Sequence, residues 1–162
     1  MIRAAVGFVE AYQRRQLLTA TYTAYLENWP SGDTIEIRDK LPIASITAVK
    51  YKADDDDGTL TTITSTNYGT RLPYASPAWI KFIDGYSYPT LKTGAVERIQ
   101  ISLTAGYGTA DQIPWTTRAA IRMLVSDFVD ERGTVIIGTT ANEIPNKLKR
   151  CLDPECWTIS GY

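Results

Sequence analysis

The sequence contains no histidine among its 162 residues. Histidine is the commonest general base near neutral pH and the commonest metal ligand in proteins. Its absence excludes most hydrolase arrangements and leaves only carboxylate, lysine, tyrosine or cysteine chemistry. We therefore expect neither a bound metal nor a cofactor.

Cysteine is almost as scarce, because the chain has only Cys151 and Cys156, in the sequence CLDPEC. There is no second cysteine pair and no histidine to complete a zinc site with them. The pattern favours two reduced thiols beside a turn that contains proline, and a local disulfide is the alternative.

Long apolar runs are also missing. No segment approaches the roughly 20 apolar residues that a membrane-spanning helix needs. The first residues, MIRAAVGFVEAYQRRQ, are interrupted by polar side chains too early for the apolar region of a signal peptide. We therefore expect a protein that is made and kept in the cytoplasm, without membrane contact.

Charge of one sign is not in excess, since 17 basic and 18 acidic residues give a net charge of −1. Tight DNA binding depends on neutralising phosphates with clustered Lys and Arg. A nearly neutral chain is a poor candidate for that role, although it can line a channel through which DNA passes. The apolar share of 44% is ordinary for a globular protein, and we expect one domain over residues 1–162.

Hydrophobic periodicity predicts an α+β fold. Apolar residues at helical spacing over 2–12 predict a short N-terminal helix, which must pack on its own domain or on a neighbouring subunit. Two-residue alternation then predicts a meander of short antiparallel strands. The expected strands cover residues 18–26, 35–37, 45–52, 60–63, 67–72, 79–83 and 96–103, the last with Ile99, Ile101 and Leu103 on its apolar face.

An acidic turn separates two of these strands and predicts a hairpin. The acidic residues are Asp54, Asp55, Asp56 and Asp57, followed by Gly58. A calcium loop of the EF-hand type fails here, because the residue six positions into that pattern is Gly58 and the first position is then Ala53. We expect a solvated hairpin tip. Residues 84–94, which include Tyr86 and Tyr88, are loop-like.

The second half of the chain predicts a long amphipathic helix. The sequence Ala-Gly-Tyr-Gly at 105–108 indicates a chain reversal, and the phosphate-binding loop pattern is absent. Pro114 suits a first helical turn, and an apolar stripe then runs through a helix over 115–132. The stripe consists of Ile121, Leu124, Val125 and Phe128, and Gly133 is a natural stop.

The C-terminal part is expected to start with a loop over 134–142, followed by a short helix over 144–152. The tail beyond it carries Trp157, Ile159 and Tyr162. Large apolar residues in a tail either fold back on their own domain or anchor into a partner, where aromatic residues dominate binding. The sequence leaves both alternatives open.

The order of these elements resembles the phage head–tail connector (adaptor) family, which includes the gp6-like connectors of HK97-type tailed phages. The matching segments are FVEAYQRRQLLTATYTAYLENWP (8–30), LPIASITAVKYKADDDDGTL (41–60) and VERIQISLTAGYGTADQIPWTTRAAIRMLVSDFVDERG (96–133). Members typically carry another helical segment upstream of the first match. The tail of this chain matches no motif of the family.

The resemblance implies a virion protein that assembles into a ring, twelvefold in that family, beneath the portal. The ring extends the DNA channel and receives the next head-completion (stopper) or tail protein, and DNA passes through without sequence-specific binding. By analogy we expect residues 143–162 to contact the portal, through Leu148, Leu152, Trp157, Ile159 and Tyr162. We expect the distal or lumenal side to carry Asp54, Asp55, Asp56, Asp57, Tyr86 and Tyr88.

Two other classes compete with this hypothesis. A glycan hydrolase would need two carboxylates in one cleft, for which Glu97 and Asp127 are candidates that no motif brings together. A monomeric ligand-binding or adhesion module would explain the many Tyr and Trp residues. The expected function is structural, without catalysis.

Overall fold

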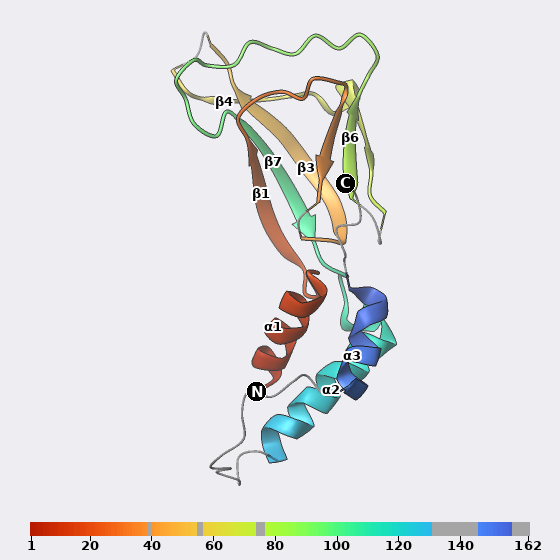
Figure 1. Cartoon of the computed structure of the whole chain (residues 1–162). Coiled ribbons are helices and arrows are strands. Elements are labelled where there is room, and N and C mark those ends of the chain that lie inside the picture. The colour runs from red at the N-terminus through yellow and green to blue at the C-terminus, as the bar shows by residue number, and fades with distance from the viewer. Residues whose placement is uncertain (39, 55–56, 74–76, 131–145, 157–162) are drawn as a thin grey trace.

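The computed structural model describes residues 1–38, 40–54, 57–73, 77–130 and 146–156. Two antiparallel sheets form one end of an elongated molecule, and three helices form the other (Figure 1). The α+β fold that the periodicity predicts is therefore confirmed. None of the helices in the described residues combines the length and the apolar character that crossing a membrane requires.

The larger sheet has four strands in the order β1-β7-β3-β4. β7 lies in the interior of this sheet, and its residues alternate between buried and half-buried. Ile99, Ile101 and Leu103 form the buried face that the alternation predicts. β7 begins later than expected because Glu97 has a left-handed backbone, with φ 52°, so the chain still turns there. The strands are β1 (Ala20–Leu26), β3 (Ile43–Lys52), β4 (Leu60–Thr62) and β7 (Ile99–Ala105).

The smaller sheet has three strands in the order β2-β6-β5. Ile35 and Ile37 of β2 and Ile80 and Phe82 of β6 join the buried face of the larger sheet in one apolar core. The strands pair antiparallel, as predicted, but they form two sheets where a single meander was expected, because alternation identifies a buried face and not the neighbouring strand. The strands are β2 (Thr34–Ile37), β5 (Tyr68–Arg71) and β6 (Ala78–Phe82).

The three helices enclose a second apolar core. Ala5 and Val9 of α1 meet Leu124 of α2 and Leu148 and Leu152 of α3. The predicted N-terminal, long and C-terminal helices are confirmed, and the expected end of the long helix at 131–132 and the expected loop at 134–142 lie outside the described residues. The helices are α1 (Ile2–Gln13), α2 (Trp115–Asp130) and α3 (Asn146–Leu152), with 3₁₀ turns η1 (Ser65–Asn67), η2 (Ala110–Gln112) and η4 (Asp153–Glu155).

The chain passes from the helices to the sheets and returns at one place. Ala20, at the start of β1, pairs with Ala105, at the end of β7. Beyond this pair Gly106 has φ 109°, in the left-handed region that favours glycine. A Cβ atom on Gly106 would lie 2.6 Å from the carbonyl oxygen of Leu18. The predicted chain reversal is thus a close backbone crossing that only glycine fits.

We expect Gly106→Ala to destabilise the protein by about 2 kcal/mol or more, because the new methyl group meets fixed backbone and the left-handed angle is strained. Gly7→Ala is the matched control. Gly7 lies within α1, and no atom would lie within 4 Å of a methyl group added there, so alanine should stabilise the helix by roughly 0.5–1 kcal/mol. Urea unfolding measures both, and equal effects of the two substitutions would contradict this account of the crossing.

Candidate interaction site

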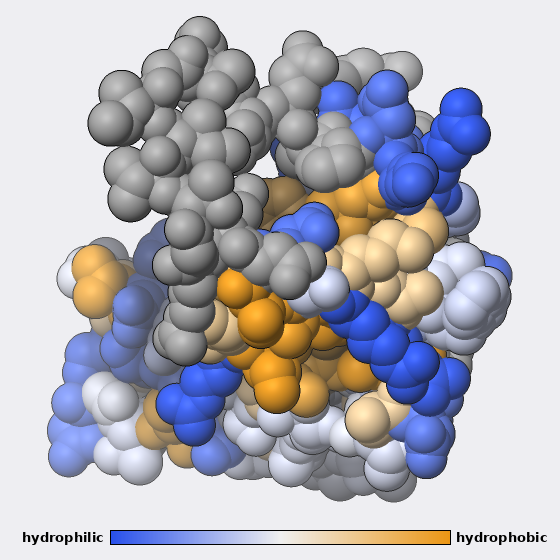
Figure 2. Space-filling view, turned by 90° about the horizontal axis from the view of Figure 1, so that it is seen from below, coloured by the Kyte–Doolittle hydropathy of each residue, from blue (hydrophilic) through white to orange (hydrophobic). Residues whose placement is uncertain are grey.

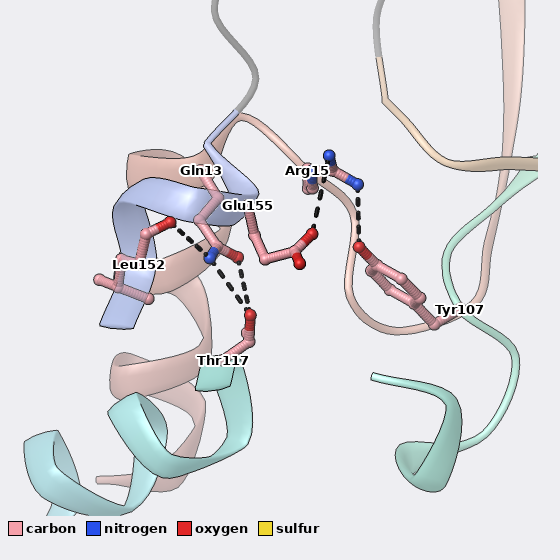
Figure 3. A network of polar contacts seen from close by, with 6 residues as sticks. All are labelled: Gln13, Arg15, Tyr107, Thr117, Leu152 and Glu155. Atoms are coloured by element: carbon pink, nitrogen blue, oxygen red, sulfur yellow. Dashed lines mark hydrogen bonds and ion pairs between the residues drawn. The ribbon is translucent and has the colours of Figure 1, made fainter. Parts of the chain in front are cut away.

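A buried amide joins the three helices. Gln13 lies in the last turn of α1 with an exposure of 0%. Its Nε2 atom donates to Thr117 Oγ1 of α2 at 3.2 Å and to the Leu152 carbonyl oxygen of α3 at 3.1 Å (Figure 3). Burying an amide is costly unless it is hydrogen-bonded. Gln13 therefore fixes α2 and α3 relative to the end of α1.

A buried guanidinium joins the helices to the sheets. Arg15, two residues beyond α1, is 8% exposed. It donates from Nη1 to the Tyr107 hydroxyl at 3.0 Å, and its Nη2 lies 3.9 Å from Glu155 Oε2 (Figure 3). Tyr107 follows β7 and Glu155 lies in η4. The Arg15 side chain therefore contacts both the segment that leaves the larger sheet and the C-terminal part of the chain. We call Gln13, Arg15 and these partners the polar junction.

A third contact attaches η4 to α1. The Tyr12 hydroxyl donates to Asp153 Oδ1 at 2.6 Å. This hydrogen bond to a carboxylate, together with burial, raises the pKa of Tyr12 to about 12. The Cys156 thiol lies 3.4 Å from the Tyr12 carbonyl oxygen. Both cysteines are free thiols, as the favoured interpretation of CLDPEC predicts.

The expected portal residues fall into two groups. Leu148 and Leu152 are 3% and 0% exposed and pack inside the helical core of their own chain. Trp157, Ile159 and Tyr162 lie outside the described residues. A portal contact at this end therefore stays a prediction. Within the described part of this segment, the solvent-exposed surface of α3 is basic and carries Lys147 and Arg150.

The helical end also presents apolar surface. Viewed from that end, apolar side chains gather in the middle of the face and are bordered by hydrophilic ones (Figure 2). Large exposed apolar patches commonly mark interaction sites. The large apolar residues of α1 and α2, or next to them, that stay exposed are Met1, Ile2, Trp115, Met123 and Val129.

The two segments expected on the distal or lumenal side lie together at the opposite end (Figure 1). Ala53 forms a bridge with Leu91, and the Lys92 amide donates to the Lys52 carbonyl at 3.0 Å. The Thr93 amide donates to Asp54 Oδ1 at 3.3 Å. The hairpin tip and the loop over 84–94 thus form one surface, on which Asp54 and Asp57 are exposed, whereas Asp55 and Asp56 lie outside the described residues.

Tyr86 and Tyr88 anchor this loop to the core. The Tyr88 ring stacks on Trp29 with centroids 4.9 Å apart, and the Tyr86 ring stacks on Phe82 at 5.0 Å. The Tyr88 hydroxyl donates to the Gly32 carbonyl at 2.8 Å. Burial raises the pKa of both tyrosines. Their half-buried rings therefore position the loop, and the sequence held no local signal for these distant contacts.

The carboxylates proposed for a hydrolase do not come together. Glu97 is exposed in the turn before β7, where its amide bonds to Glu27. Asp127 is exposed on α2, in the helical part of the molecule. Among the residues that the structure describes, no three Cys, Asp or Glu side chains are grouped closely enough to hold a metal ion.

Solved structures resemble this chain along almost its whole length. A chain in the neck of an empty gene transfer agent (GTA) particle, computed with C6 symmetry, matches with a TM-score of 0.73 and 20% identity, over 99% of this chain and 77% of that one. A chain in the neck of the native GTA particle, computed with C12 symmetry, matches with a TM-score of 0.72 and 20% identity, over 99% and 82%. This chain has their fold.

A third match, in the virion of the native GTA particle, has a TM-score of 0.71 and 21% identity, over 99% of this chain and 77% of that one. No protein-family model matches the sequence, and no curated protein matches it either. The likeness therefore concerns the fold, which spans both the sheets and the helices.

We expect Tyr107→Phe to destabilise the protein by about 1–2 kcal/mol, because the buried Arg15 guanidinium loses a hydrogen-bond acceptor. Urea unfolding measures the change. Tyr25→Phe is the matched control, because Tyr25 is half exposed on β1, and its effect should stay within about 0.5 kcal/mol. If the polar junction does not contribute to stability, both substitutions will change the free energy of unfolding by the same small amount.

Tyr12 should weaken the fold at high pH. Its pKa is raised from 10.0 to about 12, so the folded state holds this proton more tightly than the unfolded state. Its contribution to stability is complete below about pH 10 and is lost as the pH rises to about 12. In an absorbance titration of tyrosinate, Tyr12→Phe should lower the absorbance change near pH 12 by the equivalent of one tyrosine, whereas Tyr25→Phe should leave it unchanged. An unchanged absorbance change near pH 12 in Tyr12→Phe would refute the assignment.

Proposed function

We propose that this protein is a structural component of the neck of a tailed-phage-like particle. The observation that carries the proposal is the likeness to GTA neck chains, which covers 99% of this chain at TM-scores of 0.72 and 0.73. A match of this extent includes the sheets, the helices and their connection. The resemblance to head–tail connectors of HK97-type phages, drawn from element order, points to the same class of protein.

The proposed assembly is a ring of identical subunits, of which twelve is the expected number. The similar chains come from necks computed with C12 and C6 symmetry. A closed ring needs a head-to-tail contact between two different, complementary patches of each subunit. The ring surrounds the DNA channel, and the balanced charge of the chain suits a passage that must not retain DNA.

The two ends of the subunit suit two partners. The helical end, with its apolar face and the basic surface of α3, is the proposed portal side, and the tail with Trp157, Ile159 and Tyr162 is the proposed anchor. Leu148 and Leu152 then act indirectly, because they hold α3 in its own core. The hairpin tip and the loop over 84–94 face the stopper or tail protein, or the lumen.

In this proposal residues 1–162 act as one adaptor domain, with 143–162 as its partner-binding part. The protein is assembled in the cytoplasm of the host bacterium and ends in the virion. Its role is to position partners, and no step requires catalysis. The exposed carboxylates Glu97 and Asp127, which lie in different parts of the molecule, agree with that role.

A monomeric ligand-binding module is the second candidate. A groove of about 320 Å³ opens beside β1, which is at the lower limit for small-molecule sites. Native mass spectrometry of the purified protein, alone and mixed with portal rings, separates the two functions. A protein that stays monomeric and does not bind the portal would favour the ligand-binding module and reject the proposed neck function.

The portal assignment can be tested with a truncation after Cys156, which keeps α3, η4 and their buried contacts. We expect the truncated protein to keep its unfolding midpoint and to lose portal binding at least about tenfold, because aromatic anchors contribute much of an interface's binding energy. Biolayer interferometry with immobilised portal rings measures the affinity.

The matched control for the truncation changes the opposite end of the molecule. Asp54→Ser together with Asp57→Ser alters the exposed hairpin tip and should leave portal affinity unchanged. Undiminished portal binding by the truncated protein would remove the tail from the proposed interface. Loss of binding in the hairpin variant would reverse the proposed orientation of the subunit.

A further inference from the structure

Among the residues that the structure describes, β1 has an edge without a strand partner and without the usual protection. It pairs with β7 on one side only, over seven residues in unbroken register, and Figure 1 shows it at the outer edge of the larger sheet. Natural edge strands discourage further pairing by being short, by carrying charge or proline, or by a bulge. The sequence of β1, ATYTAYL, contains neither charge nor proline.

The other edge strands of the described part are protected. β4 has three residues and β5 has four, and β5 contains a glycine and ends in Arg71. β2 also has four residues and includes Glu36. These three edges thus carry the protection that β1 lacks. β1 is therefore the strand on which a further strand would add most readily.

A groove runs along this same edge. Five consecutive residues of β1, Tyr22–Leu26, line it. Because neighbouring side chains of a strand point to opposite faces, a groove that reaches all five follows the main-chain edge of the strand. Four consecutive residues from β2 onward, at 35–38, line the other side, and β2 pairs only with β6. Within the described part of the chain, the groove thus separates two strand edges that have no further strand partner.

The groove is suited to an extended polypeptide. It has a volume of about 320 Å³, and its floor includes the buried apolar residues Ile101 and Leu103 of β7. Backbone N–H and C=O groups along an edge bind another backbone, and alternate side-chain pockets add affinity. At the rim Glu36 and Arg38 pair with each other at 2.8 Å. Lys40 also lines the groove, with its Nζ over the Tyr22 ring at 5.3 Å from the ring centroid, and the remaining lining residues are uncharged.

We propose that β1 and this groove receive an extended segment from a second copy of this chain, and that this contact is one of the two subunit interfaces in the ring. The inference rests on the proposed neck function, because the symmetric necks that contain chains of this fold identify the second copy as the occupant. The contact is head-to-tail, since the donor segment and the β1 groove are different surfaces. The added strand lies between β1 and β2 and closes the open side of the two sheets.

Hydrogen exchange measured by mass spectrometry or NMR tests the contact without any substitution. In an edge strand, alternate amides point away from the paired neighbour. In the monomer we expect about half of the amides over 20–26 to exchange fast. In the ring their exchange should slow about tenfold or more, because a second strand then binds them. An unchanged exchange rate over 20–26 in the ring would overturn the proposal.

A charged substitution provides an independent test. Ala24 lines the groove, and an inward charge on an edge strand blocks pairing. Ala24→Lys should lower the ring population at least about tenfold in native mass spectrometry. Thr66→Lys, which adds the same charge at an exposed site in η1, should assemble normally. Urea unfolding checks that both variants fold. If Ala24→Lys does not fold, the hydrogen-exchange experiment alone tests the β1 contact.

The outcomes separate this inference from the proposed function. A ring in which residues 20–26 stay unprotected and Ala24→Lys assembles normally rejects the β1 contact and leaves the neck function standing. Protection of 20–26 that appears only when portal is added assigns the groove to the portal and rejects the second copy. Slower exchange over 20–26 when a small molecule binds the monomer also rejects the second copy as the occupant of the groove. A protein that never assembles, with or without portal, rejects both proposals.

Discussion

The arrangement of the two halves of this protein depends on one constraint, the burial of Gln13 and Arg15 at the polar junction. A buried amide and a buried guanidinium are tolerated only when their partners are in place. Those partners come from α2, from α3, from Tyr107 two residues beyond β7, and from η4. Apolar packing alone allows neighbouring arrangements of similar energy, whereas these hydrogen bonds accept one orientation. The junction thus sets how far apart, and at what angle, the helical end and the surface of the hairpin tip and the loop over 84–94 lie.

Local periodicity is sufficient to predict the helices and strands, but it does not predict which strands lie next to each other. The apolar spacing of 2–12 and the stripe from Ile121 to Phe128 identified α1 and α2, because helical faces are encoded within a few turns. The alternation at Ile99, Ile101 and Leu103 identified the buried face of β7. Nothing in that alternation indicated that β7 lies between β1 and β3, or that β2 leaves to pair with β6, because strand order depends on contacts between residues far apart in the chain.

Prediction of the candidate surfaces had the same limit, because contacts between residues far apart in the sequence could not be predicted. The Asp-rich turn and the loop over 84–94 were assigned to one side from the family resemblance, and the structure brings them together through Ala53 and Leu91. Tyr86 and Tyr88 anchor the loop through Trp29 and Phe82, and no local pattern could connect residues so distant in sequence. Leucines at 148 and 152 are four positions apart, which suits a buried helix face as well as a docking face, and the structure shows the buried face. The lack of charge in ATYTAYL was visible in the sequence, but its importance depends on β1 being an edge.

The pairing of Ala20 with Ala105 has a topological consequence. The polypeptide leaves the helical bundle and returns to it at adjacent points. The whole β region is therefore inserted between two neighbouring points of the helical part. Segments whose ends meet in this way are those in which insertion and circular permutation are tolerated. Selection can therefore lengthen, shorten or exchange the β region, and with it the surface of the hairpin tip, while the helical part keeps its geometry.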